Sequence, residues 1–287
     1  MTQAATPGAQ LRTALQTARE QQRVLPFVGI YDLFSASLAA DHFKALFLSG
    51  FGLAASAYGL PDIGFISWGD LTTTTSRLRT LLPAHHLLVD IDDGFGDPAV
   101  ASHVARSLER CGASGVVLED QARPRRCGHL NGKQLSPLPD YLSKLKTVLQ
   151  ERTSLVVVAR TDASDPDDIL LRVQAYEQAG CDAVLADGIK DLDLIAQLRK
   201  TVNCPVFCNV IGGGQVPAAS RADLAAQGVQ GLIYSTPCLF AAQGAIEQAL
   251  QQLTRDDAPL GDALAGPRGL SHCQAVLQNN LVRAGGA

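Results

Sequence analysis

The sequence has few of the features that would tie it to nucleic acid or to a membrane. Charged residues make up 18% of the 287 residues, the formal net charge is -4, and no block of like charges occurs. A basic face that could neutralise a phosphate backbone is therefore absent, so we expect no nucleic-acid partner. No run is apolar for the length that a bilayer crossing requires, and the opening MTQAATPGAQ lacks the charged and apolar regions of a secretory signal. We therefore expect a cytoplasmic protein with no membrane partner.

The seven cysteines are odd in number and include no CxxC pair. This pattern argues against a disulfide framework and against a structural zinc site. Cys127 stands out because it lies in the polar run ARPRRCGHLNGK, beside Arg125 and Arg126. Positive neighbours favour the thiolate, so we interpret Cys127 as an acid/base or nucleophile rather than as an inert loop thiol. For His129, two residues further on, an ordinary solvated loop histidine is the alternative to a catalytic one.

Eight short apolar runs rich in Val, Ile, Leu and Phe recur along the chain, separated by longer segments with helical periodicity. This alternation predicts parallel strands joined by helices, and eight strands close a single-domain (β/α)8 barrel of the TIM type. The hydrophobic fraction of 46% is enough for a large core. The predicted strands are residues 26–30, 45–48, 86–91, 115–120, 155–160, 182–187, 204–209 and 231–235.

Helices are expected between these strands and at both ends of the chain. Several helical segments open with Asp-Pro or Ser and close on Gly, which are typical cap residues. We divide the chain into an N-terminal helical extension (1–24) that could plug the barrel bottom, the barrel (25–253) and a C-terminal helical tail (254–287). The predicted helices are residues 8–22, 35–43, 97–112, 165–180, 191–202 and 271–283.

The longest interruption of this rhythm is QARPRRCGHLNGKQLSPLPD, from Gln121 to about Asp140. Its Gly and Pro residues and its basic cluster prevent a regular helix. Long loops without secondary structure in compact domains commonly serve as active-site lids. We therefore expect this loop, which carries Cys127 and His129, to cover the active site.

The active site of a (β/α)8 barrel lies at the carboxyl ends of the strands, and here the residues at those ends are strongly polar. Asp90, Asp92 and Glu119 follow two adjacent strands and offer the hard oxygen ligands that Mg²⁺ prefers. A single strand-end acid more often caps a helix or forms an ion pair, but three unneutralised carboxylates facing one cavity would repel, so we expect a divalent cation. The polar strand ends are Tyr31, Asp32, Ser49, Asp90, Asp92, Asp93, Glu119, Asp120, Arg160, Asp162, Asp187, Asn209 and Ser235.

Arg160 ends the most continuous apolar strand, where an unpaired guanidinium would be costly. It must therefore meet carboxylates, either those of a substrate or, in a structural salt bridge, those of Glu119 or Asp187. Asn209 adds a neutral donor to the same rim. The NVIGGG run that begins there would let backbone amides approach a ligand, although a tight turn explains its glycines equally well.

Five stretches of the chain carry a resemblance to a known family. They are SGFGLAASAYGLPDIG (49–64), DIDDGFG (90–96), LEDQ with RRCGH (118–129), ARTDA (159–163) and NVIGGG (209–214). Together they resemble the isocitrate lyase and phosphoenolpyruvate mutase superfamily, in particular its short lyases such as methylisocitrate lyase, dimethylmalate lyase and the petal death protein. The resemblance runs from about Pro26 to Phe240. It implies a small-molecule carboxylate as partner and a homotetramer, in which family members exchange a C-terminal helix between neighbours.

The resemblance also implies roles for individual residues. The metal, Mg²⁺ with Mn²⁺ as an alternative ion, would be bound by Asp90, Asp92 and Glu119, and supported through water by Asp62 and Asp187. The substrate-binding residues expected are Tyr31, Ser49, Gly50, Gly128, Arg160 and Asn209. The catalytic residues expected are Cys127, Arg160 and His129.

These roles predict a magnesium-dependent carbon–carbon lyase. It would cleave a malate-like 2-hydroxy di- or tricarboxylate by retro-aldol chemistry to a 2-oxo acid such as pyruvate and a second carboxylate. The metal and Arg160 would fix the 2-hydroxy carboxylate while a base removes the hydroxyl proton, and Cys127 would protonate the enediolate-like fragment. The base is unassigned, with Tyr31 as a candidate.

Three positions depart from the family pattern. Arg125 stands where Lys is common, Asp187 where Glu is common and Gly212 where an acid is common, which bears on the substrate more than on the reaction class. Two other activities of this scaffold stay open: hydrolysis or decarboxylation of oxaloacetate, and interconversion of phosphoenolpyruvate and phosphonopyruvate, which the Cys-Gly-His signature disfavours. A barrel without catalysis is the last alternative, against which the complete set of acidic, arginine and cysteine residues argues.

Overall fold

The computed structural model describes residues 5–126, 128, 132–214, 219–255 and 269–285. Eight parallel strands follow one another around a closed barrel, and β1 pairs with β8 to complete it. The predicted (β/α)8 barrel is confirmed, and each strand begins and ends within two residues of its predicted run. The strands are β1 (Leu25–Ile30), β2 (Ala45–Leu48), β3 (His86–Asp90), β4 (Gly115–Glu119), β5 (Val156–Thr161), β6 (Ala183–Ala186), β7 (Val206–Val210) and β8 (Val229–Tyr234).

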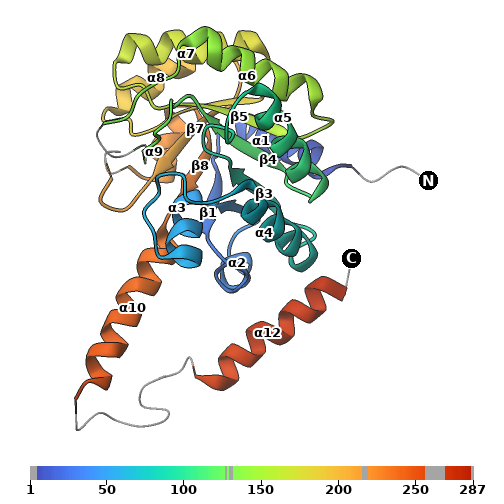
Figure 1. Cartoon of the computed structure of the whole chain (residues 1–287), viewed down its shortest axis with the longest axis vertical. Helices are drawn as coiled ribbons and strands as arrows, with labels where there is room; N and C mark the ends of the chain where they lie inside the picture. Colours follow the sequence, from blue (N-terminus) through green and yellow to red (C-terminus); the bar gives the residue numbers. More distant parts are fainter. Residues whose placement is uncertain (1–4, 127, 129–131, 215–218, 256–268, 286–287) are drawn as a thin grey trace.

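The helices pack around the outside of the barrel, and their starts follow the expected cap chemistry (Figure 1). Asp97 and Asp165 cap α5 and α7 by accepting hydrogen bonds from backbone amides of the first turn, ahead of a proline. None of the described helices is long and apolar enough to cross a membrane. The helices are α1 (Pro7–Glu20), α2 (Leu33–Ala40), α3 (Gly50–Leu53), the π-helical turn η1 (Ala54–Tyr58), α4 (Trp68–Leu81), α5 (Pro98–Arg110), α6 (Leu138–Glu151), α7 (Pro166–Ala179), α8 (Leu192–Thr201), α9 (Arg221–Ala226), α10 (Pro237–Leu253) and α12 (Leu270–Gly285).

Two layers of apolar side chains form the core. One lies between the strands and the surrounding helices, and the other fills the inside of the barrel. In the inner layer the rings of Phe27 and Phe207 lie with centroids 5.6 Å apart. Gly231 on β8 leaves the space that the ring of Phe207 fills, so a side chain at this position would collide with that ring. The interior is therefore a packed core, and any ligand space is confined to its ends.

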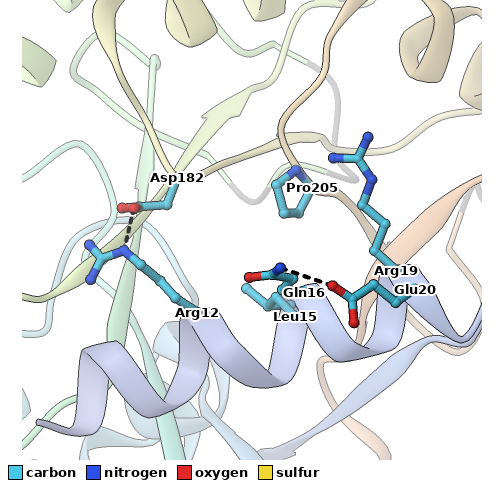
Figure 2. Close-up of a pocket in the computed structure, with 7 residues that line it drawn as sticks. All are labelled: Arg12, Leu15, Gln16, Arg19, Glu20, Asp182 and Pro205. Atoms are coloured by element: carbon cyan, nitrogen blue, oxygen red, sulfur yellow. Dashed lines mark hydrogen bonds and ion pairs between the residues drawn. The ribbon is translucent and has the colours of Figure 1, made fainter. Parts of the chain in front are cut away.

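The N-terminal helix α1 seals the bottom of the barrel, at the amino ends of the strands. Leu11 and Leu15 of α1 are fully buried within the inner layer. The Nε of Arg12 donates to Oδ1 of Asp182 at 2.7 Å, which ties the helix to the segment before β6 (Figure 2). A cavity of about 570 Å³ remains beside this contact, at the opposite end of the barrel from the polar strand ends.

The two C-terminal helices leave the barrel and return to it. Helix α10 projects away from the body, and none of its residues is buried (Figure 1). Helix α12 comes back against α2 and α4, where the Nδ2 of Asn280 donates to Oγ of Ser37 at 2.8 Å and Arg283 forms an ion pair with Asp41. The helix expected at 271–283 is thus present as α12.

The predicted lid loop between β4 and α6 is held at both ends. Gln121 forms an antiparallel bridge with Leu135, and the amide of Ala122 donates to the carbonyl of Gln134 at 2.8 Å. Helix α6 begins at Leu138, two residues before the expected end of the loop. Cys127 and His129 lie outside the described residues.

Candidate active site

Four carboxylates meet at one side of the barrel mouth. Asp90 is the last residue of β3 and Glu119 the last of β4, while Asp92 follows β3 at φ 50°, a left-handed backbone that aspartate tolerates better than most residues. Asp62 reaches them from the loop between η1 and α4. All four side chains are buried, with exposed fractions of 1–8%. The structure thus brings together the acids that the sequence places on neighbouring strands.

The backbone at the end of β2 packs directly against these acids. Ser49 caps α3, with its Oγ accepting a hydrogen bond from the amide of Gly52 at 3.1 Å. At the next position, Gly50, a Cβ would lie 3.3 Å from carboxylate oxygens of both Asp90 and Asp92. A larger residue would press on the acids, which explains the glycine here.

Arg125 supplies a positive charge that sequence reasoning did not place in the site. Its guanidinium is 2% exposed and lies among three acids, with contacts of 2.5 Å to Asp62, 3.0 Å to Asp92 and 2.9 Å to Glu119. The sequence analysis expects Arg125 to lower the pKa of Cys127. In the structure the guanidinium of Arg125 instead points into the acid cluster. A residue of the lid loop thus neutralises part of the charge for which the sequence analysis expects a divalent cation.

Arg160 of β5 is surrounded by carboxylates of the protein. Its Nη2 lies 2.7 Å from Oδ2 of Asp187, 2.9 Å from Oδ1 of Asp162 and 3.4 Å from Oε2 of Glu119. The structure therefore confirms the structural salt bridges of Arg160 with Glu119 and Asp187. Arg160 also lines the cavity described below, so its charge can still act on a ligand.

A buried network holds Asp162 in place beneath Arg160. The Nε2 of Gln121 donates to Oδ2 of Asp162 at 2.5 Å, and the amide of Asp162 donates to Oδ1 of Asp120 at 3.0 Å. The Oδ2 of Asp120 in turn accepts from Tyr176 at 2.6 Å and from Arg172 at 3.0 Å. The sequence places Asp120 and Asp162 at strand ends. Its periodicity does not indicate their hydrogen-bond partners, which lie far away along the chain.

The neutral residues of β7 and β8 continue this chain of contacts. The amide of Asn209 donates to Oδ1 of Asp187 at 2.9 Å, and the hydroxyl of Ser235 donates to Oδ1 of Asn209. Asn209 was expected to donate to a substrate. In the structure its amide group instead links Asp187 to Ser235.

A small cavity lies among these side chains at the mouth of the barrel. Its volume is about 20 Å³, room for one water molecule. Gly128 of the lid loop covers it so closely that a Cβ there would overlap Asp187 and Arg160. A substrate therefore needs the loop to withdraw before it can reach Arg160. The cavity is lined by Phe47, Ser49, Phe51, Asp62, Asp90, Val117, Gly128, Arg160, Leu185, Asp187, Asn209, Ile211, Ile233 and Ser235.

Tyr31 lies close to Ser49, since a Cβ at Gly52 would be 2.9 Å from the Cβ of Tyr31 and 3.4 Å from that of Ser49. It does not line the cavity, and partial burial, Asp32 and Cys238 raise the pKa of its hydroxyl. Asp32 itself caps α2, accepting from the amide of Ser35 at 2.7 Å. The role of Tyr31 as a substrate-binding residue or as the hydroxyl base stays a prediction.

Burial and mutual repulsion make the acid cluster hard to ionise. Burial raises the pKa of Asp92 to about 8, with Arg125 opposing the shift and Asp90 adding to it. Burial also raises the pKa of Asp90 and Glu119, although both arginines oppose it. The pKa of Arg160 is raised because Asp162, Asp187 and Glu119 outweigh the effect of burial. Burial thus outweighs the two arginines in setting the direction of the shifts in the acid cluster, and a further cation bound there would favour the ionised acids.

The donor set suits a hard divalent cation. Oδ1 of Asp92 lies 3.0 Å from Nη2 of Arg125 and Oε2 of Glu119 lies 3.4 Å from Nη2 of Arg160, but neither buried oxygen accepts a hydrogen bond, so each keeps lone pairs that a further cation can use. Mg²⁺ binds through one or two carboxylates and keeps several waters. Asp90 lines the cavity, whereas Asp92 and Glu119 contact Arg125, and the set of three direct metal ligands stays a prediction. Within the described part of the chain, no three acidic, His or Cys side chains are grouped to hold a metal ion.

Comparison with known proteins identifies the family. The model of the phosphoenolpyruvate phosphomutase family matches residues 15–254. The chain belongs to this family. It is 35% identical to the 2-methylisocitrate lyase of Bacillus subtilis over 231 residues, which are 78% of this chain and 75% of that enzyme. The expectation of an enzyme, a carbon–carbon lyase, is thereby confirmed.

Solved structures of the same superfamily share the whole fold. An oxaloacetate acetylhydrolase bound to the inhibitor 3,3-difluorooxalacetate superposes with a TM-score of 0.88 at 26% identity, covering 98% of this chain and 97% of that one. A phosphonopyruvate hydrolase bound to oxalate and Mg²⁺ superposes with a TM-score of 0.81 at 26% identity, covering 98% of both chains.

Proposed function

We propose that the protein is a magnesium-dependent lyase that cleaves a malate-like 2-hydroxy carboxylate by retro-aldol chemistry to a 2-oxo acid and a second carboxylate. The observation that carries this proposal is the convergence of Asp90, Arg160 and Gly128 on one small cavity. An acid for a metal, a cation for a carboxylate and the loop of Cys127 all meet there.

Asp90 would bind the metal directly, because it faces the cavity and among the described residues it forms no ion pair. Asp62 and Asp187 line the same cavity and would support the ion through water. Asp92 and Glu119 would contribute their charge from behind Arg125. When bound, Mg²⁺ would polarise the substrate's 2-oxygen and stabilise the oxo product, and Mn²⁺ would serve as a substitute.

Arg160 would bind the carboxylate next to the reacting carbon, held at the right angle by Asp162 and Asp187. A base removes the 2-hydroxyl proton, the carbon–carbon bond breaks, and the electron pair passes to the departing fragment as an enediolate. Cys127 would return a proton to that carbanion, with His129 beside it in the chain. Ser49 and the backbone of Gly50 would provide the remaining contacts to the substrate.

Hydrolysis of oxaloacetate is the second candidate. The shared fold with an oxaloacetate acetylhydrolase, at a TM-score of 0.88, favours it as an alternative. The two reactions differ in that hydrolysis adds water to a 2-oxo acid, whereas the lyase reaction needs a 2-hydroxyl group and a proton donor. Cys127 in the lid loop favours the lyase.

The deciding experiment measures pyruvate or glyoxylate release from methylisocitrate, isocitrate, dimethylmalate and citramalate, and oxalate release from oxaloacetate, each with Mg²⁺ and with EDTA. Cys127→Ser is compared with the native enzyme, and Cys111→Ser, at the end of α5, serves as a matched control. Release from a hydroxy acid that requires Mg²⁺ and collapses only in Cys127→Ser supports the lyase. Activity on oxaloacetate that survives Cys127→Ser would instead support the hydrolase.

We also propose a cytoplasmic homotetramer that exchanges its C-terminal helices. The support is α10, which carries exposed Ile246, Leu250 and Leu253 away from the barrel (Figure 1). Such an apolar face is expected to be covered by a neighbouring subunit. Light scattering tests this directly, since a mass of 30.3 kDa would show a monomer.

A further inference from the structure

The walls of the cavity at the barrel mouth differ sharply in charge. On the side of β3, β5 and β6 it is lined by Asp90, Arg160 and Asp187. On the side of α3, β7 and β8 the lining consists of Phe51, Asn209, Ile211 and Ser235, none of which is ionisable. We call these two sides the charged wall and the neutral wall.

The neutral wall is apolar at its rim. The ring of Phe51 packs edge-on against that of Phe240, with centroids 6.3 Å apart and an angle of 85°. Gly212 lies beside the same ring, since a Cβ there would be 3.7 Å from Cδ2 of Phe240. Ile211 completes this rim. A substrate group that reaches it would meet aromatic and aliphatic carbon.

The polar groups of the neutral wall are largely engaged with one another and with Asp187. The hydroxyl of Ser235 donates to Asn209, and the amide of Asn209 donates to Asp187. The hydroxyl proton of Ser235 and one N–H of Asn209 are thus engaged, which leaves the second N–H of Asn209 as the one side-chain donor that this pair can offer a substrate. Leaving a buried acceptor unpaired costs a large part of its desolvation energy.

Positive charge is confined to the opposite wall. Among the described residues that line the cavity, Arg160 is the one cation, and three acids surround it. The guanidinium of Arg125 is occupied by Asp62, Asp92 and Glu119. The ammonium of Lys133 donates to the carbonyl of Gly128 and does not line the cavity.

We infer that the site accepts dicarboxylates with small alkyl substituents and discriminates against tricarboxylates. The inference rests on the proposed function and narrows its substrate class. The two carboxylates lie on the charged wall, served by Arg160 and the metal. The rest of the substrate faces Phe51, Ile211 and Phe240, where a methyl group is buried favourably and a third carboxylate finds no counter-charge.

Binding of unreactive analogues tests this inference without requiring turnover. Calorimetry in the presence of Mg²⁺ compares succinate, methylsuccinate, 2,3-dimethylsuccinate and propane-1,2,3-tricarboxylate. Burial of each methyl group should tighten Kd about four-fold. The tricarboxylate should bind at least about ten-fold more weakly than dimethylsuccinate because its third carboxylate stays unpaired. A tricarboxylate that binds tightest, methyl groups without effect, or failure of every analogue to bind would overturn the inference.

A variant that introduces a charge tests whether the neutral wall determines the specificity. Ile211→Lys adds an ammonium there and should reverse the order, so that the tricarboxylate binds more tightly than dimethylsuccinate. Ile211→Leu, the matched control, should keep the native order, and circular dichroism verifies that both variants fold. An unchanged native ratio in a folded Ile211→Lys protein would contradict the assignment. The native comparison stands by itself if that variant does not fold.

The two proposals fail separately. Tight binding of dimethylsuccinate without cleavage of any hydroxy acid would reject the lyase activity and retain the binding preference. Cleavage of hydroxy acids together with preferred binding of the tricarboxylate would retain the lyase and reject the alkyl preference.

Discussion

Replacing Arg125 with methionine should destabilise the protein in a way that depends on both pH and magnesium. The side chain is 2% exposed and is the shared partner of Asp62, Asp92 and Glu119. Removing one partner of a buried ion pair typically costs about 3–5 kcal/mol. At about 2 °C per kcal/mol for a chain of this size, Tm should fall by about 6–10 °C at pH 8 in EDTA.

The pH dependence follows from the raised pKa values in the cluster. An acid whose pKa is higher in the folded than in the unfolded protein binds more protons when folded, so stability falls as pH rises between the two values. For Asp92 that window runs from its ordinary value of about 4 to about 8. Without Arg125 the pKa should rise further. The loss in Tm should therefore be smaller at pH 5.5, where more of the cluster is protonated, than at pH 8.

Thermal melts of native protein, Arg125→Met, Arg125→Lys and Arg77→Met provide the test, each at both pH values, with EDTA or Mg²⁺. Arg125→Lys keeps the charge and should lose less stability, and Arg77, an exposed residue of α4, controls for loss of surface charge. Mg²⁺ should restore part of the Tm of Arg125→Met. A methionine variant that melts within about 2 °C of the native protein at pH 8 in EDTA would refute the argument that Arg125 neutralises the cluster.

Three further substitutions should separate activity from stability. Gly128→Ala should lower kcat/KM at least about hundred-fold, because its Cβ would overlap Asp187 when the loop is closed, as steady-state kinetics would show. Asp162→Asn should lower kcat/KM by about ten- to hundred-fold, because the ion pair that positions Arg160 is weakened. The loss of rate should be largest at substrate concentrations below KM. Leu15→Ala should destabilise the fold by about 2–5 kcal/mol in a denaturant titration while leaving kcat at 25 °C near native.

Each of these predictions has a contrary outcome, and the glycine substitution has a matched control. Gly244 in α10 has open space around it, so Gly244→Ala should leave kinetics unchanged. Near-native activity of Gly128→Ala would mean that the loop does not close in this manner during catalysis. Native kinetics for Asp162→Asn would remove its positioning role. A stable Leu15→Ala protein would show that α1 does not plug the barrel.

The strands could be predicted because strands buried on both faces appear as continuous apolar runs, such as the one that ends at Arg160. The gathering of Asp90 and Glu119 followed from the geometry of a parallel barrel, whose strand ends share one rim. Both predictions use only local pattern and a general property of the fold. They needed no knowledge of side-chain direction.

The contacts that could not be predicted from the sequence depend on the directions of individual side chains. Arg125 lies in an irregular loop, so neither periodicity nor strand order showed that its guanidinium enters the acid cluster rather than acting on Cys127. Tyr31 follows directly after β1 and neighbours Ser49, yet its side chain does not line the cavity. Asn209 was correctly placed at the rim, but its partner Asp187 depends on the packing of two neighbouring strands.

The two ends of the barrel differ in how strongly a substitution there affects folding stability. Leu11 and Leu15 close the interior at one end, whereas Phe51 and Ile211 stand outside the two buried core layers at the other. Substitutions at these two rim positions therefore leave the stabilising layers intact, unlike the replacement of a buried ion-paired residue such as Arg125. Substrate range and folding stability can vary almost independently in such a scaffold, so a family of catalysts can diversify at the rim of one unchanged core.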